Sequence, residues 1–304
     1  MTAIELDGVT KRFGDLTAVS DLSLEVQEGE VYGFLGPNGA GKSTTINLVL
    51  DFIRPTDGTV RVLGRDAQKD SVAIRQRTGV LPEGFSVYDR LTGTQHVEFA
   101  IESKDADDDP EDVLDRVGIL DAADRKAGGY SKGMCQRLAL GMALVGDPDL
   151  LILDEPSTGL DPNGAREMRE IVREEADRGT TVFFSSHVLG QVEAVCDRVG
   201  ILREGTLVAE DTIEGLRDAT GAETTLCVET TSVPNGAVDE VRAVDGVSGV
   251  TQDDDVLYVD CDPSAKTTAI ATLEGAGVDV VDFETEETSL EDIFVTYTEQ
   301  EVSA

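Results

Sequence analysis

Several residue types that mark particular classes of protein are rare or missing in this sequence. Trp is absent from the 304 residues, aromatic side chains make up 5%, and histidine occurs only as His96 and His187. The four cysteines lie far apart, at positions 135, 196, 227 and 261, and none forms a Cys-x-x-Cys pair. This pattern excludes zinc-site spacing and predicts reduced, structural thiols.

A long hydrophobic run is also missing. The longest apolar stretch, Leu138 to Gly146, has nine residues, whereas a membrane-spanning helix needs about 20. The first residues, Met1 to Val9, include acids and no basic segment, so no secretory signal is visible. We therefore expect a cytoplasmic protein that does not itself cross a membrane.

Basic residues are few. The chain has 25 Lys and Arg against 61 Asp and Glu, which gives a formal net charge of −36 and a pI near 4.1. Such a chain repels phosphate backbones, so we expect no nucleic-acid partner. Lys (7) is rarer than Arg (18), and Asp (34) exceeds Glu (27). This bias resembles proteins of salt-accumulating halophiles, where about 1 M salt shortens the Debye length to roughly 3 Å. An ordinary acidic cytosolic protein is the alternative.

Length and charge distribution predict two domains. Residues 221–304 hold 20 acids and 2 bases, so this short segment has a net charge of −18, as much as the whole of residues 1–220. The hydrophobic content of 40% is that of a folded chain. We place one domain at 1–220 and an accessory α+β domain at 221–304.

The apolar pattern predicts an α/β fold in the first domain. Apolar and polar positions alternate over the first 30 residues and again over 57–65, which is typical of antiparallel strands. Short apolar runs predict buried strands at 31–35, 150–153, 181–185 and 198–202. Residues 91–145 have a helical pattern that a solvated acidic stretch, 105–112, interrupts. Strands that alternate with helices predict a parallel sheet with helices on both faces.

The pattern of the second domain predicts the order strand, helix, strand, strand, helix, strand. A closing helix is expected near Leu290 to Tyr297.

A glycine-rich loop follows the strand predicted at 31–35. Its sequence fits G-x4-G-K-[ST] and comprises Gly36, Pro37, Asn38, Gly39, Ala40, Gly41, Lys42, Ser43 and Thr44. Glycines let successive N–H groups face one point, and a following helix adds its N-terminal dipole, so the loop suits phosphate binding. In such a loop Lys42 reaches the β- and γ-phosphates and Ser43 ligates Mg²⁺.

A second motif is the apolar strand 150–153 followed by Asp154 and Glu155. Ligands bind at the carboxyl ends of the strands in open parallel sheets. Asp154 is placed to hold Mg²⁺, and Glu155 to polarise an attacking water as general base. Alone, this motif is a weak indicator of a nucleotide site. It follows Gly36 by 118 residues, and together with the glycine-rich loop it is a strong indicator.

A third motif, Tyr-Ser-Lys-Gly-Met at 130–134, precedes Asp154. Together with Thr-Gly-Leu-Asp at 158–161 and the pair Ser186-His187, the series resembles an ATP-binding-cassette (ABC) transporter ATPase over residues 1–220. The resemblance implies a P-loop NTPase fold: a RecA-like parallel sheet, an antiparallel β subdomain and a helical signature subdomain.

The third motif departs from the family's usual Leu-Ser-Gly-Gly-Gln. Ser131 and Gly133 are kept, and the resemblance implies that they contact the γ-phosphate held by the other subunit of a dimer. Lys132 replaces a glycine; it either adds positive charge near that phosphate or is solvated. The Tyr-Ser-Lys-Gly-Met form is similar to the branch that serves type-2 exporters.

Glu83 stands where the family has a glutamine that senses Mg²⁺ and the attacking water. A carboxylate accepts hydrogen bonds or contacts the metal but cannot donate as an amide does. Glu83 is therefore expected in the site as a catalytic and metal-contacting residue. Residues 84–91, which follow it, resemble the surface that receives the permease's coupling helix.

The resemblance assigns roles to three further residues. It implies that His187 is the switch histidine at the γ-phosphate and that Asp161 couples the two ATP sites. It also implies that Phe13 stacks on adenine, although a core aromatic is the alternative for Phe13. His96 does not belong to any of these motifs, and we predict that it lies on a helix surface.

The function implied is the ATP-binding and ATP-hydrolysing subunit of an exporter, with ATP and Mg²⁺ as cofactors. Two copies, as a homodimer or heterodimer, would act on a separate membrane permease and hold the protein at the inner face of the membrane. Two alternatives stay open: a soluble ABC ATPase of the repair or translation type, and a module that binds nucleotide without hydrolysis. The tail, whose segment 289–294 resembles the end of the same branch's ATPases, either stabilises or regulates the dimer, or adds solubility.

Overall fold

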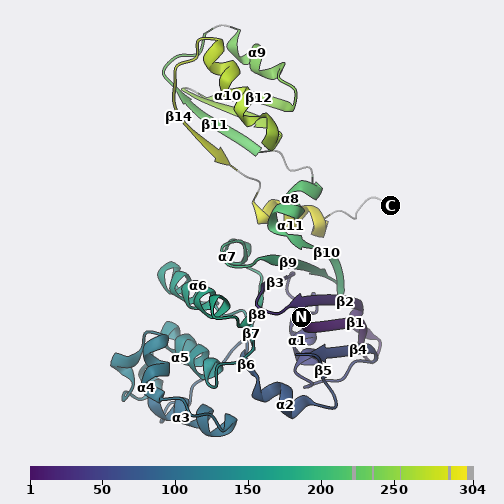
Figure 1. The fold of residues 1–304 in the computed structure, drawn as a ribbon, viewed down its shortest axis with the longest axis vertical. Helices are drawn as coiled ribbons and strands as arrows, with labels where there is room; N and C mark the ends of the chain where they lie inside the picture. Colours follow the sequence, from purple (N-terminus) through teal and green to yellow (C-terminus); the bar gives the residue numbers. More distant parts are fainter. Residues whose placement is uncertain (221–223, 235, 254, 287–288, 300–304) are drawn as a thin grey trace. The chain divides into compact units, whose positions relative to one another are not determined.

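The computed structural model describes residues 1–220, 224–234, 236–253, 255–286 and 289–299. The chain divides into two compact units, Met1–Ile213 and Glu214–Ala304, drawn in Figure 1 from purple to yellow along the sequence. The division falls a few residues before the domain boundary placed at residue 220, because the short helix α8 (Ile213–Thr220) is grouped with the second unit.

The central sheet of the first unit has the strand order β10-β9-β3-β8-β7-β6. Its strands span Val31–Leu35 (β3), Thr78–Leu81 (β6), Leu150–Asp154 (β7), Thr181–Ser186 (β8), Arg198–Arg203 (β9) and Thr206–Thr212 (β10). All neighbours pair in parallel except β10, which pairs antiparallel with β9. Strands β3, β7 and β8 are buried along their whole length, as parallel strands covered on both faces must be.

A second sheet is antiparallel, with the order β2-β1-β4-β5. Its strands span Thr2–Phe13 (β1), Leu16–Gln27 (β2), Asp57–Val62 (β4) and Arg65–Asp66 (β5). Buried and exposed positions alternate along β2 and β4, because only one face of this sheet meets the core. The antiparallel strands predicted from the alternating pattern are confirmed.

The main core lies between the two sheets, around helix α1 (Lys42–Val49). The helix contributes Ile46, Leu48 and Val49, which are almost fully buried. The aromatic rings of Tyr32 and Phe183 stack in this core, at 5.9 Å between ring centroids. The phosphate loop immediately before α1 is therefore attached to the main core of the unit.

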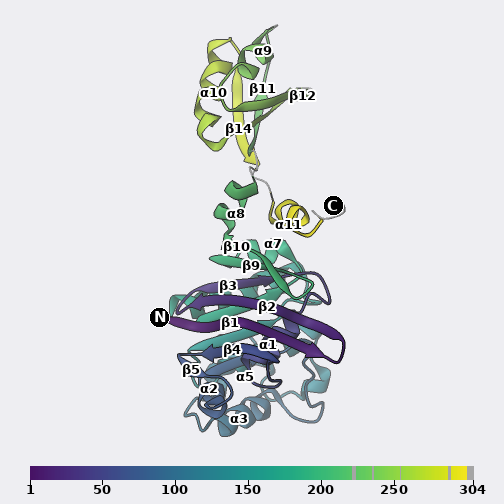
Figure 2. The ribbon, with the colours of Figure 1, turned by 90° about the vertical axis from the view of Figure 1, so that its right-hand side faces the viewer.

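The opposite face of the central sheet is covered by helices (Figures 1 and 2). These are α5 (Lys132–Leu144), α6 (Pro162–Asp177) and α7 (Leu189–Glu193). Helices α3 (Gly93–Lys104) and α4 (Pro110–Arg116) pack on α5, and α2 (Ser71–Gln76) precedes β6. Short 3-10 turns lie at Leu120–Ala122 and Ala127–Gly129. The predicted α/β fold with helices on both faces is confirmed.

The second unit has the chain order predicted for it. Its elements are β11 (Thr224–Thr230), α9 (Ala237–Arg242), β12 (Val247–Asp253), β13 (Val256–Cys261), a 3-10 turn (Pro263–Ala265), α10 (Lys266–Gly275), β14 (Val280–Glu286) and α11 (Leu290–Glu299). The sheet order is β12-β13-β11-β14, antiparallel throughout. Alternate residues of β11 and β13, among them Val228 and Val259, form a core with α9 and α10.

Across the residues that the structure describes, no helix combines the length and the apolar character that a membrane span requires.

A buried carboxylate joins the helical part of the first unit to helix α6. Glu175 is 1% exposed and receives hydrogen bonds from Arg116 at the end of α4, through both its Nε (2.8 Å) and its Nη2, and from Arg178 at 2.8 Å. Two guanidinium groups therefore compensate one desolvated negative charge. Loss of the carboxylate removes the buried partner of Arg116, whose side chain is 19% exposed.

We expect Glu175→Ala to lower the free energy of unfolding by about 3 kcal/mol, the cost of breaking a buried ion pair from one side. Urea denaturation measures this change. The neighbouring Glu174 is exposed, so Glu174→Ala serves as the control and should shift stability by less than about 0.5 kcal/mol. Equal effects of the two substitutions would show that the Glu175 cluster contributes nothing to the fold.

Candidate functional site

The phosphate loop runs from the carboxyl end of β3 into the N-terminus of α1. At two positions of this loop a neighbouring backbone carbonyl lies so close that only glycine fits. A Cβ at Gly36 would lie 2.5 Å from the carbonyl oxygen of Leu202, and one at Gly41 would lie 2.6 Å from that of Ala18. Gly41 also has φ +111°, which side chains disfavour. The loop is thus held between β2 and the turn that follows β9.

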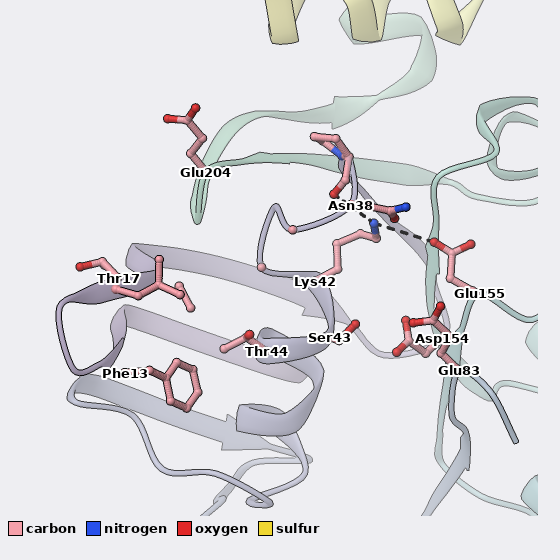
Figure 3. Close-up of a pocket in the computed structure, with 15 residues that line it drawn as sticks. Phe13, Thr17, Asn38, Lys42, Ser43, Thr44, Glu83, Asp154, Glu155 and Glu204 are labelled. Carbon is pink, nitrogen blue, oxygen red and sulfur yellow. Dashed lines mark hydrogen bonds and ion pairs between the residues drawn. The ribbon is translucent and has the colours of Figure 1, made fainter.

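Lys42 projects from the start of α1 across the loop, as Figure 3 shows. Its Nζ donates to the carbonyl of Gly36 at 2.6 Å and lies 3.8 Å from Oε1 of Glu155. The side chain is 7% exposed. A buried ammonium group therefore stands between the phosphate loop and the end of β7.

Asp154 ends strand β7 and is 6% exposed. Ser185 on β8 donates its hydroxyl to Oδ1 of Asp154. Burial raises the pKa of Asp154, and the nearby negative charges of Glu83 and Glu155 act in the same direction, while the Ser185 hydrogen bond and Lys42 oppose them. Figure 3 shows Glu83 and Asp154 beside each other. This crowding of carboxylates favours a bound cation.

Glu155 turns the chain sharply at the end of β7. Its φ of +51° lies in the left-handed region, which costs about 1–3 kcal/mol and is concentrated at functional sites. Its carboxylate is 7% exposed. Oε2 lies 2.8 Å from Nδ1 of His187, and Oε1 faces Lys42. Glu155 is therefore oriented from two sides by groups that come from α1 and from the end of β8.

These elements surround a pocket of about 640 Å³. The sequence-predicted residues that line it are Phe13, Pro37, Asn38, Gly39, Gly41, Lys42, Ser43, Thr44, Glu83, Asp154 and Glu155. Gly36 and Ala40 belong to the same loop but do not line the pocket, because Ala40 is buried and Gly36 packs on Leu202. His187 reaches the pocket through its contact with Glu155.

One end of the pocket is formed by the hairpin between β1 and β2. Phe13 is 48% exposed there and is not a core side chain, and the ammonium of Lys11 lies 4.9 Å from the centroid of its ring. Leu16, Thr17 and Ala18 also line this end, and sequence reasoning missed them. These residues directly follow the turn after Phe13, and this proximity in sequence could have indicated that they line the same end of the pocket.

Glu204 is a further pocket residue that sequence reasoning missed. It lies on the turn between β9 and β10, far from every motif in the sequence. No sequence signal pointed to it, because only the tertiary structure brings that turn against the phosphate loop.

Ser131, Lys132 and Gly133 lie elsewhere, in a second pocket of about 600 Å³ that Gly159, Leu160 and Asp161 also line. Ser131 caps helix α5, since its hydroxyl accepts from the N–H of Met134 at 3.2 Å. The side chain of Lys132 lies directly against Gly159, where a Cβ would be 1.9 Å from Nζ. The signature loop and the phosphate loop therefore form two separate surfaces of one unit.

His96 was predicted on a helix surface, and this is wrong. It is 1% exposed, and its Nε2 accepts from the backbone N–H of Tyr88 at 2.9 Å. Its Nδ1 lies 2.7 Å from the carbonyl of Thr92. A neutral imidazole that donates through Nδ1 satisfies both contacts. The polarity of His96 did not reveal its burial, because a histidine with two partners fits a protein interior.

The donor set fits Mg²⁺ without a complete protein cage. Within the described part of the chain, no group of three His, Cys, Asp or Glu side chains is arranged to hold a metal by itself. Mg²⁺ is ordinarily held by one or two carboxylates together with substrate phosphates and water. The hydroxyl of Ser43 and the buried carboxylate of Asp154 line one pocket. Burial first, and then the charges of Glu83 and Glu155, raise the pKa of Asp154, so a bound cation would stabilise its ionised form.

The sequence matches two known families. Residues 19–158 match the family described as "ABC transporter", and residues 212–298 match "ATP-binding protein DrrA1-3-like, C-terminal domain".

The relatives match either nearly the whole chain or about seven tenths of it. Daunorubicin/doxorubicin resistance ATP-binding protein DrrA of Streptomyces peucetius is 35% identical over 97% of this chain and 92% of its own length. Bacitracin transport ATP-binding protein BcrA of Bacillus licheniformis is 39% identical over 71% and 72%. A solved "ATP binding subunit of ABC transporter" superposes with a TM-score of 0.67 at 27% identity, over 72% of this chain and 94% of that one.

The chain therefore belongs to the ATP-binding cassette ATPases of ABC transporters. Within that family it is an ATP-binding subunit of the DrrA type.

The two glycines Gly39 and Gly41 provide a test of the loop geometry. Both have positive φ, but only Gly41 meets a backbone carbonyl where a Cβ would stand. We expect Gly39→Ala to lower the unfolding free energy by about 1 kcal/mol, the cost of the left-handed conformation alone. Gly41→Ala should cost about 3 kcal/mol, because steric overlap is added. Denaturant titration compares the two, and equal losses would contradict the close contact with β2.

Proposed function

We propose that this chain energises export through a separate membrane permease by ATP-driven closure of a dimer. The observation that carries the proposal is the separation of the two pockets. The signature residues Ser131 to Gly133 face a different pocket from Lys42 and Glu155. A site that needs both loops is completed by a second copy, or by a similar subunit, that offers its signature loop to this phosphate loop.

In this proposal the nucleotide occupies the first pocket. Its triphosphate lies on the N–H groups of residues 36–44 and on Lys42, and Phe13 stacks on the adenine. Bound Mg²⁺, held by Ser43 and Asp154 with Glu83 nearby, would neutralise charge on the phosphate oxygens. Support comes from the one cavity that Phe13, Lys42, Ser43, Glu83 and Asp154 all line.

Glu155 is proposed as the general base. A carboxylate that is buried beside Lys42 and His187 is held in one orientation, as an attacking water requires. His187 then connects the base to the end of β8 and to the γ-phosphate. Because the Lys42 ammonium already faces Oε1 of Glu155, a phosphate that attracts Lys42 would also change the surroundings of the base.

The permease is proposed to contact the segment 84–91, which follows Glu83. Tyr88 in this segment is 65% exposed, while its backbone N–H is fixed by the buried His96. The segment thus exposes an aromatic side chain to solvent, while a hydrogen bond to His96 fixes the backbone that carries it. Attachment through a permease would place the protein in the cytoplasm, peripheral on the inner face of the membrane, as a homodimer or heterodimer of ATPase subunits.

The acidic composition is proposed to be an adaptation to a concentrated-salt cytoplasm. A net charge of −36 opposes folding in dilute buffer through self-repulsion, and molar salt screens it. In this proposal the charge is an adaptation to the solvent and has no part in the transport function.

The base assignment predicts the behaviour of Glu155→Gln. ATP turnover should fall by about 10²–10⁴-fold, the usual contribution of a general base, while ATP still binds and the dimer accumulates because it cannot reopen. Phosphate release and size-exclusion chromatography with ATP measure the two effects. Glu102→Gln, at an exposed position of α3, is the control. Steady turnover in Glu155→Gln would sink the assignment.

The salt proposal predicts that the melting temperature and ATP turnover both rise as KCl increases from about 0.1 M toward molar concentration, where the Debye length is roughly 3 Å. Choline chloride at the same ionic strength separates screening from specific K⁺ binding. Full stability and activity in dilute buffer would count against the proposal.

A further inference from the structure

Glu204 occupies an unusual place at the nucleotide pocket. It is exposed, lines the pocket and lies on the two-residue turn that joins β9 to β10. None of the pocket roles described above uses it. Figure 3 shows it on the turn, well away from Asp154 and Glu83, at the side of the pocket where Thr17 lies.

The turn that carries Glu204 is fixed to the phosphate loop. The N–H of Gly205 donates to the carbonyl of Ala40 at 2.8 Å, and the carbonyl of Gly205 accepts from Ser20 at 2.8 Å. A Cβ at Gly205 would lie 2.7 Å from the carbonyl oxygen of Ala18. The backbone of Glu204 is therefore positioned relative to the phosphate loop by contacts on both sides, and it sits next to the residue that contacts Ala40.

Glutamate is an unfavourable residue at this position. Glu204 and Gly205 have φ values of +48° and +80°, and they connect the paired residues Arg203 and Thr206. A two-residue turn with both φ values positive prefers Asn, Asp or Gly at its first position. The chain instead has a glutamate there, in a left-handed backbone conformation that is unfavourable for this residue type.

A second turn of the same kind shows what can offset this cost. Leu63 and Gly64, with φ values of +50° and +72°, join Val62 to Arg65. Leu63 packs against the core of the unit, so burial compensates the strained backbone. Glu204 has no such compensation: its side chain has no hydrogen bond or ion pair among the residues that the structure describes. Its carboxylate is therefore free to contact a bound ligand.

We propose that the carboxylate of Glu204 binds the ribose of the nucleotide by accepting hydrogen bonds from its vicinal hydroxyl groups. An ionised carboxylate is an acceptor only, and the donors of ATP are the ribose hydroxyls and the adenine amino group. Phe13, at the far end of the pocket, takes the base, whereas Glu204 adjoins the phosphate loop. The ribose lies between base and phosphates, so we assign its hydroxyls to Glu204, whose exposed side chain turns from the orientation drawn in Figure 3 to face them.

The same residue then contributes to selection among nucleotides. Its negative charge opposes the triphosphate of every nucleotide equally, while only a ribonucleotide can donate both hydrogen bonds and a 2′,3′-dideoxynucleotide can donate neither. A substitution of Glu204 should therefore change the discrimination between sugars by more than it changes overall affinity. The inference rests on the proposed placement of ATP in this pocket.

The test measures equilibrium binding to the full chain without Mg²⁺, so that no turnover occurs. ATP, 2′-deoxyATP, 2′,3′-dideoxyATP and GTP are compared for the wild type, Glu204→Ala and Glu204→Gly. We expect the wild type to bind 2′,3′-dideoxyATP about threefold to tenfold more weakly than ATP, the range of a typical net hydrogen bond, because solvent exposure weakens a bond to the charged group. In both variants this ratio should fall toward one.

Glu204→Gly carries a second readout. Glycine adopts positive φ without strain, so this variant should have a higher melting temperature than the wild type while it loses sugar discrimination. A purely structural role for Glu204 would not produce a more stable protein with poorer discrimination. Glu102→Ala, which removes an exposed charge from α3, should leave both the ratio and the melting temperature unchanged.

Three results would overturn the inference. These are a wild type that binds ATP and 2′,3′-dideoxyATP equally, variants that alter the affinity of all nucleotides by one common factor, and variants that change only the ratio of ATP to GTP. The last result would assign Glu204 to the base. Lys42→Ala is the separate check on the site itself: if that variant still binds ATP with wild-type affinity, the placement of the nucleotide fails, whatever Glu204 does.

Discussion

The site depends on the position of one ammonium group in a chain whose net charge is −36. Lys42 lies between the carbonyl of Gly36 and the carboxylate of Glu155, almost without solvent contact. In that environment a single charge and the aligned N–H groups at the start of α1 act at short range, where the field of distant surface acids is weak. A strongly acidic protein can thus hold a polyanion, provided that the loop around Lys42 stays closed against Ala18 and Leu202.

The surrounding architecture serves that requirement. The two sheets enclose α1, so the phosphate loop is attached to the main core, and parallel strands deliver Asp154 and Glu155 to the same edge. Two of the non-glycine residues with positive φ lie at the nucleotide pocket: Glu155 at the end of β7, and Glu204 on the turn after β9. The signature loop stands apart on the helical side, tied to the loop at Gly159 by the side chain of Lys132.

Sequence reasoning succeeded where the chemistry is local. The glycine-rich loop and the Asp-Glu pair are contiguous motifs, and apolar runs at β3, β7, β8 and β9 are what burial on two faces requires. It failed for His96, whose burial depends on partners at Tyr88 and Thr92 that no local pattern reveals. It also missed Glu204, because its turn reaches the pocket only through contacts between β10, β2 and the phosphate loop.

The sequence by itself determined the fold class, the ATPase family and the phosphate and carboxylate motifs, since each is encoded in short stretches with fixed spacing. The tertiary structure alone decided which residues share a pocket. It put Phe13 and Thr44 into one cavity with Glu83 and Glu155, and it separated Ser131 from them. The physical reason is that a pocket is formed by strand ends and turns that are distant in sequence, so its lining is set by sheet order and packing.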